Sequence, residues 1–456
     1  MAESDFDELY TAAEMRTAEE RYPGYPETVP ELMERAGSAV AHVGIARYRD
    51  ARRWTVVCGG GSNGGDGRIA ARELGRAGKD VVVVDAKAGE SKLGEPDVIV
   101  DALFGTGFSG EPRADASALI ERMNAYAAPI LAVDLPSGVD ASSGEIAGAA
   151  VVADATVTFH GRKVGVVVAP GRFHAGVVHV ADIGLARVET EQLLVGPGLL
   201  RSVPRRGERD NKYTAGHVLV VGGSPGLTGA PSLTAMAALR ADAGYVTLAA
   251  PESTLPVLEQ RLVEVVKRPL PDDLADLAAK ASSLAIGPGL GRGEGVRSLV
   301  RRALEGLRLP AVVDADALFG LEPADWPAPR VLTPHEGELA RLLGRDSKDV
   351  AEHRHAAVRE ATERFRCVVL LKGPDTLIAA PGRGVLVSAL GLPSLATAGT
   401  GDVLTGIIGA FLAKGMDAQL AAAAGAAAQQ RASVEAQQRA GLVAGDLIEA
   451  LPRVLR

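Results

Sequence analysis

Short runs of Val and Ile alternate along this chain with Ala-, Leu- and Arg-rich stretches of helical length. Such alternation is typical of βα units around a mostly parallel sheet, whose strands are buried on both faces. In the first half the pattern predicts strands at 54–57, 80–84, 98–100, 130–133 and 155–159. It then restarts and predicts strands at 217–221, 245–249, 284–286, 311–313, 330–332 and 367–371. The chain is therefore expected to form two α/β domains.

The stretch between the two series of strands mixes Gly, Pro and charged residues without helical periodicity, which is typical of a linker. We expect a first domain over residues 1–195, a linker over 196–210 and a second domain over 211–456. The 456 residues are enough for each domain to bury a core of its own. An Ala-rich tract at 419–430 predicts a helix, because Ala is the strongest helix former.

The composition argues against several classes of protein. Lys and Arg number 49 against 57 Asp and Glu, whereas a nucleic-acid binder needs clustered basic residues to neutralise phosphates. The two cysteines, Cys58 and Cys367, lie far apart and support neither a disulfide framework nor a cysteine zinc site. The first residues are acidic, unlike a signal peptide, and no apolar run approaches the roughly 20 residues of a membrane span. We therefore expect a soluble, cytoplasmic protein that binds neither nucleic acid nor membranes.

A glycine-rich segment, GGGSNGGDG at 59–67, follows the first predicted strand and precedes a predicted helix over 68–77. Glycine lets backbone N–H groups approach a phosphate or a ribose, and a helix N-terminus favours negative charge. A plain turn that needs positive φ angles is the alternative. Asn63 and Asp66 favour a binding role, because a turn does not require polar side chains at these positions.

Two further predicted strands of the first domain end in carboxylates, at Asp101 and Asp134. Ligands of open α/β sheets bind outside the carboxyl ends of strands, so Asn63, Asp101, Asp134 and Ser137 are expected to converge on one crevice. Such oxygen ligands suit K⁺ better than zinc. Asp134 is the candidate for proton transfer. Alternatively, each aspartate caps the helix that follows it.

In the second domain, glycine loops follow the strands at 217–221 and 284–286, and each loop is also explained by a turn alone. His335 comes directly after a strand, although a single histidine is usually just a satisfied polar residue. Lys372 and Thr376 follow another strand, at positions fit to meet phosphate or ribose. A solvated turn lysine is the alternative there.

The sharpest signal is AGTGD at 398–402, which opens an apolar helix. Gly399, Thr400 and Gly401 can present N–H groups that form an anion hole for a phosphoryl group in transfer. Asp402 can accept a proton from an attacking hydroxyl. An N-terminal Asp also stabilises a helix dipole, but that role does not explain the glycines. The motif therefore indicates phosphoryl transfer to an alcohol.

Several ordered motifs in residues 12–184, namely RTAEERY, LMERAGSAV, GGGSNGGDG, DALFGTGFSG, VDLPSG and HGRKVGVVVAPG, resemble the YjeF N-terminal family of NAD(P)H-hydrate epimerases. The resemblance implies a Rossmann-like three-layer domain in which Asn63, Asp101 and Ser137 hold K⁺. It also implies that the hydrate is contacted by Ser62, Asn63, Gly64, Gly65, Asp66, Gly105, Thr106, Gly107, Phe108, Ser109, Gly110, Glu111 and Asp134. Ser62 departs from the family, which usually has Asn there.

The second half, through GGSPGLTGAP, IGPGLG, VVDADAL, TPHEGE, LKGPDT and ATAGTGDVLTG, resembles the YjeF C-terminal branch of the ribokinase superfamily, the ADP-dependent NAD(P)H-hydrate dehydratases. The resemblance implies a ribokinase-like α/β fold, Mg²⁺, and contacts to the hydrate from Ala230, Gly289, His335 and Asp402. It assigns the nucleotide to Lys372, Gly373, Pro374, Asp375, Thr376, Gly399, Thr400 and Gly401. Asn211 stands where the family usually has His.

These resemblances imply a bifunctional repair enzyme that epimerises R- and S-NAD(P)H hydrates and dehydrates the S form with ADP, giving AMP and phosphate. Related bacterial proteins suggest a homo-oligomer. The alternative is a small-molecule kinase of the ribokinase superfamily fused to a non-catalytic binding domain, because such a kinase would use the same GTGD motif.

Overall fold

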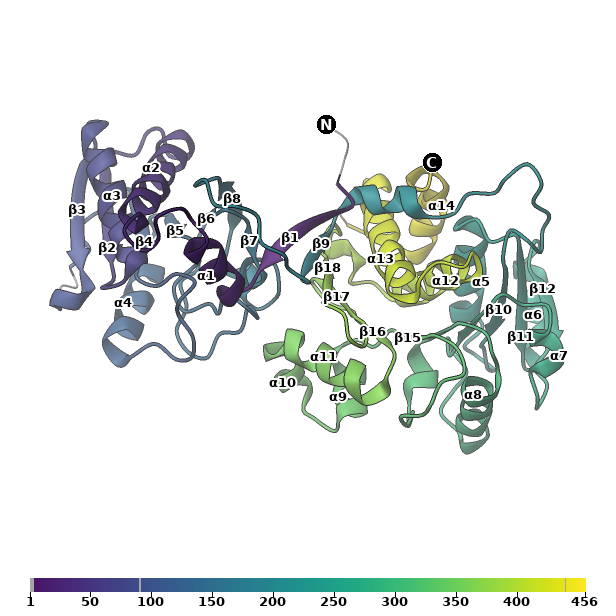
Figure 1. The fold of residues 1–456 in the computed structure, drawn as a ribbon. Coiled ribbons are helices and arrows are strands. Elements are labelled where there is room, and N and C mark those ends of the chain that lie inside the picture. Colours follow the sequence, from purple (N-terminus) through teal and green to yellow (C-terminus); the bar gives the residue numbers. More distant parts are fainter. Residues whose placement is uncertain (1–3, 90–91, 439) are drawn as a thin grey trace. The chain divides into compact units, whose positions relative to one another are not determined.

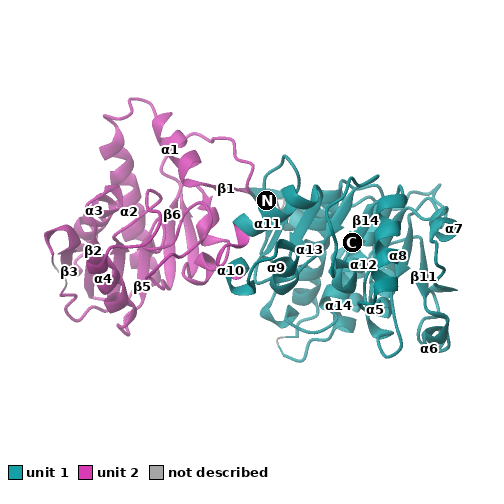
Figure 2. Cartoon of the chain, turned by 90° about the horizontal axis from the view of Figure 1, so that it is seen from below, with its two compact units in different colours: residues 1–7, 193–350, 356–456 teal, residues 8–192, 351–355 magenta. Residues whose placement is uncertain are grey.

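The computed structural model describes residues 4–89, 92–438 and 440–456 (Figure 1). The chain forms two compact units, coloured separately in Figure 2. The N-terminal unit comprises residues 8–192 and 351–355, and the C-terminal unit comprises 193–350, 356–456 and the N-terminal residues up to Asp7. The first three residues of the expected first domain lie outside the described residues.

The segment expected to be a linker, 196–210, is partly folded. Its beginning forms the 3₁₀ helix η4 (Pro197–Ser202), and Leu199 and Leu200 are buried in the core of the C-terminal unit. The residues from Pro204 to Asp210 are exposed. The apolar side chains of η4 therefore make this part of the segment an element of the C-terminal unit, which begins at Leu193.

The N-terminal unit contains a six-stranded parallel sheet in the order β3-β2-β4-β5-β6-β8. Its strands are β2 (Arg53–Cys58), β3 (Asp80–Asp85), β4 (Val98–Ala102), β5 (Ile130–Val133), β6 (Ala155–Phe159) and β8 (Val177–Ala181). Strand β1 (Phe6–Tyr10) pairs in parallel with the short β7 (Arg162–Lys163). All strands predicted for the first half are confirmed, while β1, β7 and β8 were not anticipated.

Helices cover both faces of this sheet, which makes the unit three-layered (Figure 1). Helices α2 (Val29–Arg47) and α3 (Ser62–Arg76) pack on one face, where Val98 and Val100 of β4 are buried, and α4 (Ala114–Asn124) packs on the other, with Ile99. Successive side chains of β4 therefore pack into the hydrophobic cores on opposite faces of the sheet, as expected for a sheet with helices on both faces. The remaining helical segments are α1 (Ala12–Glu20), η1 (Ala86–Ala88), η2 (Val164–Val166) and η3 (Gly171–Phe173).

The C-terminal unit is built on strands in the order β12-β11-β10-β13-β14-β15-β16-β17-β18-β9. These are β9 (Leu193–Val195), β10 (His217–Val221), β11 (Tyr245–Ala250), β12 (Val266–Pro269), β13 (Ser283–Ile286), β14 (Ala311–Val313), β15 (Arg330–Leu332), β16 (Val368–Leu371), β17 (Thr376–Ala379) and β18 (Leu386–Ser388). The seven strands β10 to β16 pair in parallel, and β17 and β18 continue as antiparallel hairpins. The strands predicted for the second half are confirmed, and the hairpin strands β17 and β18 were not anticipated, nor were β9 and β12.

Helices α5, α12, α13 and α14 pack together over one face of this sheet, and α8, α9 and α11 lie on the other side (Figure 1). The Ala-rich tract is helical, as predicted, and lies within α13. The helical segments of the unit are α5 (Gly229–Arg240), η5 (Glu252–Thr254), α6 (Leu255–Arg261), α7 (Ala275–Ala278), α8 (Glu294–Gly306), η6 (Ala315–Leu318), α9 (Glu336–Leu343), α10 (Ser347–Glu352), α11 (Arg354–Phe365), η7 (Pro393–Leu395), α12 (Thr400–Ala413), α13 (Ala418–Glu435) and α14 (Ala444–Val454). The α/β fold class is therefore confirmed for both units. Within the described ranges, none of the helices combines the length and the apolar character needed to cross a membrane.

Candidate active sites

The glycine-rich motif that follows β2 is mostly helical. The sequence predicted a loop over 59–67 and a helix over 68–77, but α3 already begins at Ser62. Glycine is needed here for close packing, because a Cβ at Gly64 would lie 2.0 Å from the carbonyl oxygen of Gly59. None of these glycines has a positive φ angle, so the alternative of a plain turn that requires such angles does not explain them. The possible anion site therefore consists of a short turn and the N-terminus of α3 itself.

A cavity of about 450 Å³ lies at the carboxyl ends of β2, β4 and β5 in the N-terminal unit. Its walls are the start of α3, the loop after β4 and one side of α1. The aromatic rings of Phe104 and Phe108 are stacked, with centroids 4.6 Å apart. The sequence-predicted residues that line this cavity are Ser62, Asn63, Asp66, Gly105, Thr106, Gly107, Phe108 and Asp134.

The other residues predicted to touch a ligand in this unit lie elsewhere. Gly64 and Gly65 lie within α3, and a Cβ at Gly65 would meet the Cε of Met33 on α2. Ser109, Gly110 and Glu111 lie further along the exposed loop that follows β4. The structure therefore brings together only part of the predicted binding set.

Asp134 occupies the end of β5 with a positive φ of 67°, a conformation that non-glycine residues rarely adopt. Its Oδ1 lies 2.7 Å from Nζ of Lys163, whose side chain is completely buried. The other oxygen, Oδ2, accepts a hydrogen bond from the backbone N–H of Thr106 at 3.2 Å. Asp134 therefore does not cap a helix, and its carboxylate is held between a buried cation and a wall of the cavity. Sequence reasoning missed Lys163, although its motif was among those that carried the resemblance.

Asn63, Asp101 and Ser137 form one network beneath the cavity. Ser137 donates to both oxygens of Asp101, from Oγ at 2.6 Å and from its backbone N–H at 2.8 Å. Asn63 donates to the carbonyl oxygen of Phe104, whose own N–H donates to Ser137 Oγ. Burial raises the pKa of Asp101 to about 6, against the hydrogen bonds from Ser137, which lower it. The predicted convergence of these three side chains is therefore present.

Asp66 is the most perturbed acid of this cavity. Burial, followed by the nearby charges of Asp134 and Glu19, raises the pKa of Asp66 to about 8. Burial also raises the pKa of Glu19, on α1. Three carboxyl groups thus meet around one cavity, and the sequence analysis did not single out Glu19, since helical periodicity alone gives no sign of which acid faces a site.

In the C-terminal unit, the AGTGD motif forms the start of α12, as predicted. Gly399 is the N-cap residue in the left-handed conformation, with φ of 89°. Among the described residues, no side chain caps this helix. The first-turn N–H groups of α12 therefore make a positively polarised helix start at the carboxyl edge of the sheet.

Asp402 lies in the first turn of α12. Burial and the charge of Asp314 raise the pKa of Asp402 to about 7, and Lys372 opposes this shift. The backbone oxygen of Asp402 accepts a hydrogen bond from Thr234 Oγ1 at 3.0 Å, which joins α12 to α5. A carboxyl group that titrates near neutrality beside a helix start is suited to accept a proton.

Lys372 is a partly buried, ion-paired lysine and not a freely solvated turn residue. Its Nζ lies 2.8 Å from Asp314 Oδ1 and 3.9 Å from Glu338 Oε2. Burial lowers the pKa of Lys372, but the charges of Asp314 and Glu338 outweigh this effect and raise it above the ordinary value. A Cβ at Gly401 would lie 3.4 Å from the same Nζ, so Lys372 lies directly beside the helix start.

Asp314, at the end of β14, is the main residue of this site that sequence reasoning missed. Besides Lys372, it accepts hydrogen bonds from Thr333 Oγ1 and Thr405 Oγ1, both at 2.8 Å. Its motif, VVDADAL, was among those that carried the resemblance, and its position at a strand end was the available signal.

His335 is the N-cap of α9, where its Nδ1 accepts the N–H of Gly337, so the structural role considered for it is present. Its backbone N–H donates to Glu338, which connects it to Lys372.

The remaining residues predicted to bind the hydrate or the nucleotide lie near the carboxyl ends of the strands of the same sheet. Ala230 lies in the first turn of α5 and its carbonyl accepts a hydrogen bond from Thr234. Gly289 has φ of 68°, and a Cβ there would lie 2.6 Å from Leu227 O. The segment from Lys372 to Thr376 forms the turn from β16 into β17, with Gly373 and Pro374 exposed and Asp375 and Thr376 buried.

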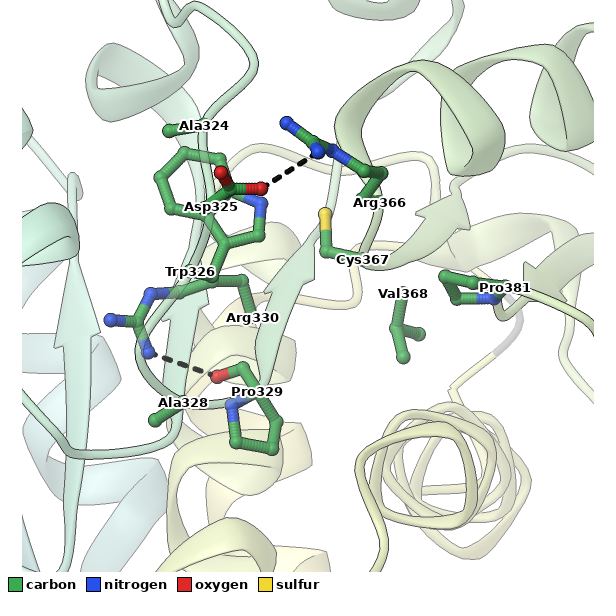
Figure 3. Close-up of a pocket in the computed structure, with 10 residues that line it drawn as sticks. All are labelled: Ala324, Asp325, Trp326, Ala328, Pro329, Arg330, Arg366, Cys367, Val368 and Pro381. Carbon is green, nitrogen blue, oxygen red and sulfur yellow. Dashed lines mark hydrogen bonds and ion pairs between the residues drawn. The ribbon is translucent and has the colours of Figure 1, made fainter.

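A second cavity, of about 420 Å³, lies at the N-terminal ends of β15 and β16 (Figure 3). Arg330, which is 1% exposed, lines it and donates to carbonyl oxygens at the end of α8, including Leu304 and Leu307. Burial lowers the pKa of Arg330 to about 10. Ligands of parallel sheets bind at the opposite, carboxyl edge, so we assign this arginine a structural role as a helix C-cap.

Comparison with known proteins identifies the family to which each half of the chain is similar. Residues 218–453 match the family model of NAD(P)H-hydrate dehydratases, and residues 29–92 and 85–165 match the model of YjeF-related protein N-termini. The bifunctional NAD(P)H-hydrate repair enzyme of Moorella thermoacetica is 39% identical, over 98% of this chain and 96% of its own length. That of Escherichia coli is 36% identical, over 94% of this chain and 90% of its own.

Solved structures resemble the C-terminal unit. The ADP/ATP-dependent NAD(P)H-hydrate dehydratase from Bacillus subtilis, co-crystallised with ATP and Mg²⁺, is 29% identical with a TM-score of 0.52, covering 58% of this chain and 96% of that chain. A ribokinase-like superfamily protein from Enterococcus faecalis, 22% identical with a TM-score of 0.51 over 59% of this chain and 97% of its own, shows the shared fold. With a YjeF-type first half and a ribokinase-like second half, the chain belongs to the family of bifunctional NAD(P)H-hydrate repair enzymes.

Proposed function

We propose that the C-terminal unit dehydrates the S form of NAD(P)H hydrate with ADP, giving AMP and phosphate, and that the N-terminal unit interconverts the R and S forms. The observation that carries this proposal is the position of Asp402. This carboxyl, with a pKa of about 7, stands in the first turn of α12, beside Lys372 and a helix start that no side chain of the described residues caps.

The chemistry of dehydration explains why a kinase-like site is suitable. The hydrated nicotinamide carries a hydroxyl on C6 beside the ring nitrogen, and hydroxide is a poor leaving group. Phosphorylation of that oxygen gives a good leaving group, which the lone pair of the ring nitrogen then expels as phosphate. Loss of a proton from C5 of the resulting iminium ion forms the C5–C6 double bond of the reduced nicotinamide. Asp402 accepts the hydroxyl proton, and the amides of Gly399 to Gly401 hold the charge that develops on the phosphoryl group.

The same geometry suggests where the nucleotide binds. Lys372 and the turn up to Thr376 lie beside the start of α12, and a lysine at this position can neutralise phosphate charge. We therefore assign the nucleotide to this turn with Gly399, Thr400 and Gly401, and the hydrate to Ala230, Gly289, His335 and Asp402.

Nucleotide and Mg²⁺ use is supported by the Bacillus subtilis relative, which was co-crystallised with ATP and Mg²⁺. Mg²⁺ in such sites usually binds substrate phosphates and one or two carboxylates, and the described residues contain no cluster of three or more His, Cys, Asp or Glu that would hold it alone. Substrate phosphates and water would then supply the ligands of Mg²⁺. When bound, Mg²⁺ would neutralise charge on the transferred phosphoryl group.

For the N-terminal unit we propose that the nicotinamide ring binds in the cavity beside Phe104 and Phe108, with Asp134 transferring a proton during epimerisation. The oxygen donors of Asn63, Asp101 and Ser137 fit K⁺, a hard cation that makes few geometric demands. Their place beneath the cavity suggests that K⁺ fixes the loop after β4. Replacing K⁺ by choline should then slow epimerisation and leave dehydration unchanged.

One assay tests both activities. The purified chain is mixed with hydrated NADH and ADP, and the absorbance of reduced nicotinamide is followed over time. Wild-type protein should recover both epimers, Asp134→Ala only one, and Asp402→Asn none. The competing small-molecule kinase would instead yield a phosphorylated alcohol and no reduced nicotinamide. The family relationship does not favour that alternative. Homo-oligomer formation and cytoplasmic location stay predictions of the sequence.

A further inference from the structure

Asp66 and Asp134 line the same cavity but differ in their surroundings. Asp134 is paired with the buried ammonium of Lys163 at 2.7 Å and accepts a backbone N–H from Thr106. Asp66 is 8% exposed, and its Oδ1 has no hydrogen-bond partner among the described residues. A buried carboxyl oxygen without a donor favours the neutral acid, whereas an adjacent cation favours the carboxylate.

The charged groups around Asp66 reinforce this difference. From α1, Glu19 and Arg16 line the same cavity, and from the end of β5 comes Asp134. The negative charges of Asp134 and Glu19 both oppose ionisation of Asp66, and with burial they raise its pKa to about 8. Lys163 is engaged with Asp134, Thr158 and the carbonyl oxygen of Phe159.

We propose that Asp66 is a second catalytic residue of the epimerase site, the proton donor that complements Asp134 as proton acceptor. This inference rests on the proposed epimerase function of the N-terminal unit. Two carboxyl groups whose surroundings favour opposite protonation states provide an acid and a base within one site. Lys163 acts as a positioning residue that holds the Asp134 side chain through the 2.7 Å ion pair.

The proposed step is a reversible ring opening. Asp134 removes the proton from the C6 hydroxyl, the C6–N bond breaks and C6 becomes an aldehyde carbonyl, while Asp66 donates its proton to the ring nitrogen. Rotation about the C5–C6 bond then presents the other face of the aldehyde. Closure reverses both transfers: the nitrogen attacks C6 and returns its proton to Asp66, and the alkoxide takes the proton from Asp134. No oxidant, reductant or co-reactant is consumed.

The test uses the full chain and measures conversion of the R hydrate of NADH in the presence of ADP. Limiting amounts of each variant are mixed with an excess of the Asp134→Asn chain, which supplies dehydration and also gives the background rate of spontaneous epimerisation. Asp66→Asn should lower the enzymatic rate about 10²-fold or more, the usual contribution of a general acid. Asp66→Glu should recover part of that loss, because it restores a transferable proton.

A pH profile separates proton donation from mere packing. Because Asp66 must be protonated to donate, the wild-type rate should fall as the pH rises through about 8, and Asp66→Asn should lose this basic limb. Asp115→Asn, which changes an exposed carboxylate on α4, should behave as wild type. Retention of more than about a third of the wild-type rate by Asp66→Asn, or a basic limb that survives in it, would overturn the assignment, given the 10²-fold effect expected.

Two further measurements distinguish a failure of the Asp66 assignment from a failure of the proposed function and from unfolding of the variant. Dehydration of the S hydrate by each variant reports the C-terminal unit, so a wild-type chain that converts neither epimer would refute the proposed function itself. If Asp66→Asn unfolds the N-terminal unit in a thermal melt, the wild-type profile decides: a basic limb near pH 8 supports the acid role, and a rate that stays constant to pH 9.5 excludes it.

Discussion

Asp314 Oδ1 lies 2.8 Å from Lys372 Nζ although 58 residues separate the two along the chain. The Asp314 side chain is 2% exposed and also accepts hydrogen bonds from Thr333, just after β15, and from Thr405 in α12. Asp314 therefore links the ends of β14, β15 and β16 to α12. The pair therefore fixes the lysine beside the helix start at which we propose phosphoryl transfer.

Removing one partner of this pair should destabilise the C-terminal unit. Lys372→Met leaves the Asp314 charge buried and unpaired, and we expect a loss of about 3–5 kcal/mol in the free energy of unfolding. Urea unfolding, followed by circular dichroism, measures this loss. Lys280→Met, at an exposed position of the same unit, should change stability by no more than about 0.5 kcal/mol. A loss of less than about 1 kcal/mol in the free energy of unfolding of Lys372→Met would mean that water stabilises the Asp314 charge in place of the lysine.

Asp402→Asn should slow dehydration strongly while leaving epimerisation intact. The amide has the shape of the carboxylate but cannot accept the hydroxyl proton, so we expect a fall in kcat of about 10²–10⁴-fold. Recovery of reduced nicotinamide from the S hydrate measures it. An unchanged kcat would exclude Asp402 as the base, and a loss of epimerisation in the same variant would indicate a general folding defect.

Dehydration should slow as the pH falls through about 7. Asp402 must be ionised to accept a proton, and its pKa of about 7 means that the ionised fraction decreases below that value. One pH unit lower, the rate should be about a tenth of its plateau if proton transfer limits turnover. The pH profile of kcat under saturating ADP checks this, and the residual activity of Asp402→Asn should show no such limb.

Two glycines of α3 should respond oppositely to alanine. At Gly64 the new Cβ would lie 2.0 Å from the Gly59 carbonyl oxygen, a backbone atom that cannot easily move, and we expect a loss of about 1–3 kcal/mol. At Gly75 no atom lies within 4 Å of the Cβ position, so Gly75→Ala should gain up to about 1 kcal/mol from helix propensity. Thermal unfolding of both variants measures these changes in stability. Stabilisation by Gly64→Ala would contradict the close packing inferred here.

The strand pattern was readable from the sequence because buried parallel strands are nearly continuous apolar runs, and each predicted run became a strand. The chemistry at strand ends was also readable: Asp101, Asp134, Lys372 and Asp402 all follow runs of this kind or open a helix beside one. The hairpin strands β17 and β18 were not predicted. The prediction relied on alternation of strands with helices, and no helix separates these short strands from each other or from β16.

The sequence by itself determined the order of the βα units and the edge of each sheet where polar side chains collect, since both follow from local periodicity and from chain direction. Only the tertiary structure decided which polar groups are neighbours. Contacts between distant segments create the ion pair of Lys163 with Asp134 and that of Lys372 with Asp314. They also bury the Oδ1 atom of Asp66, which has no hydrogen-bond partner among the described residues. The physical reason is that burial and neighbouring charge, which set the protonation state of a carboxyl group, arise only when those segments pack together.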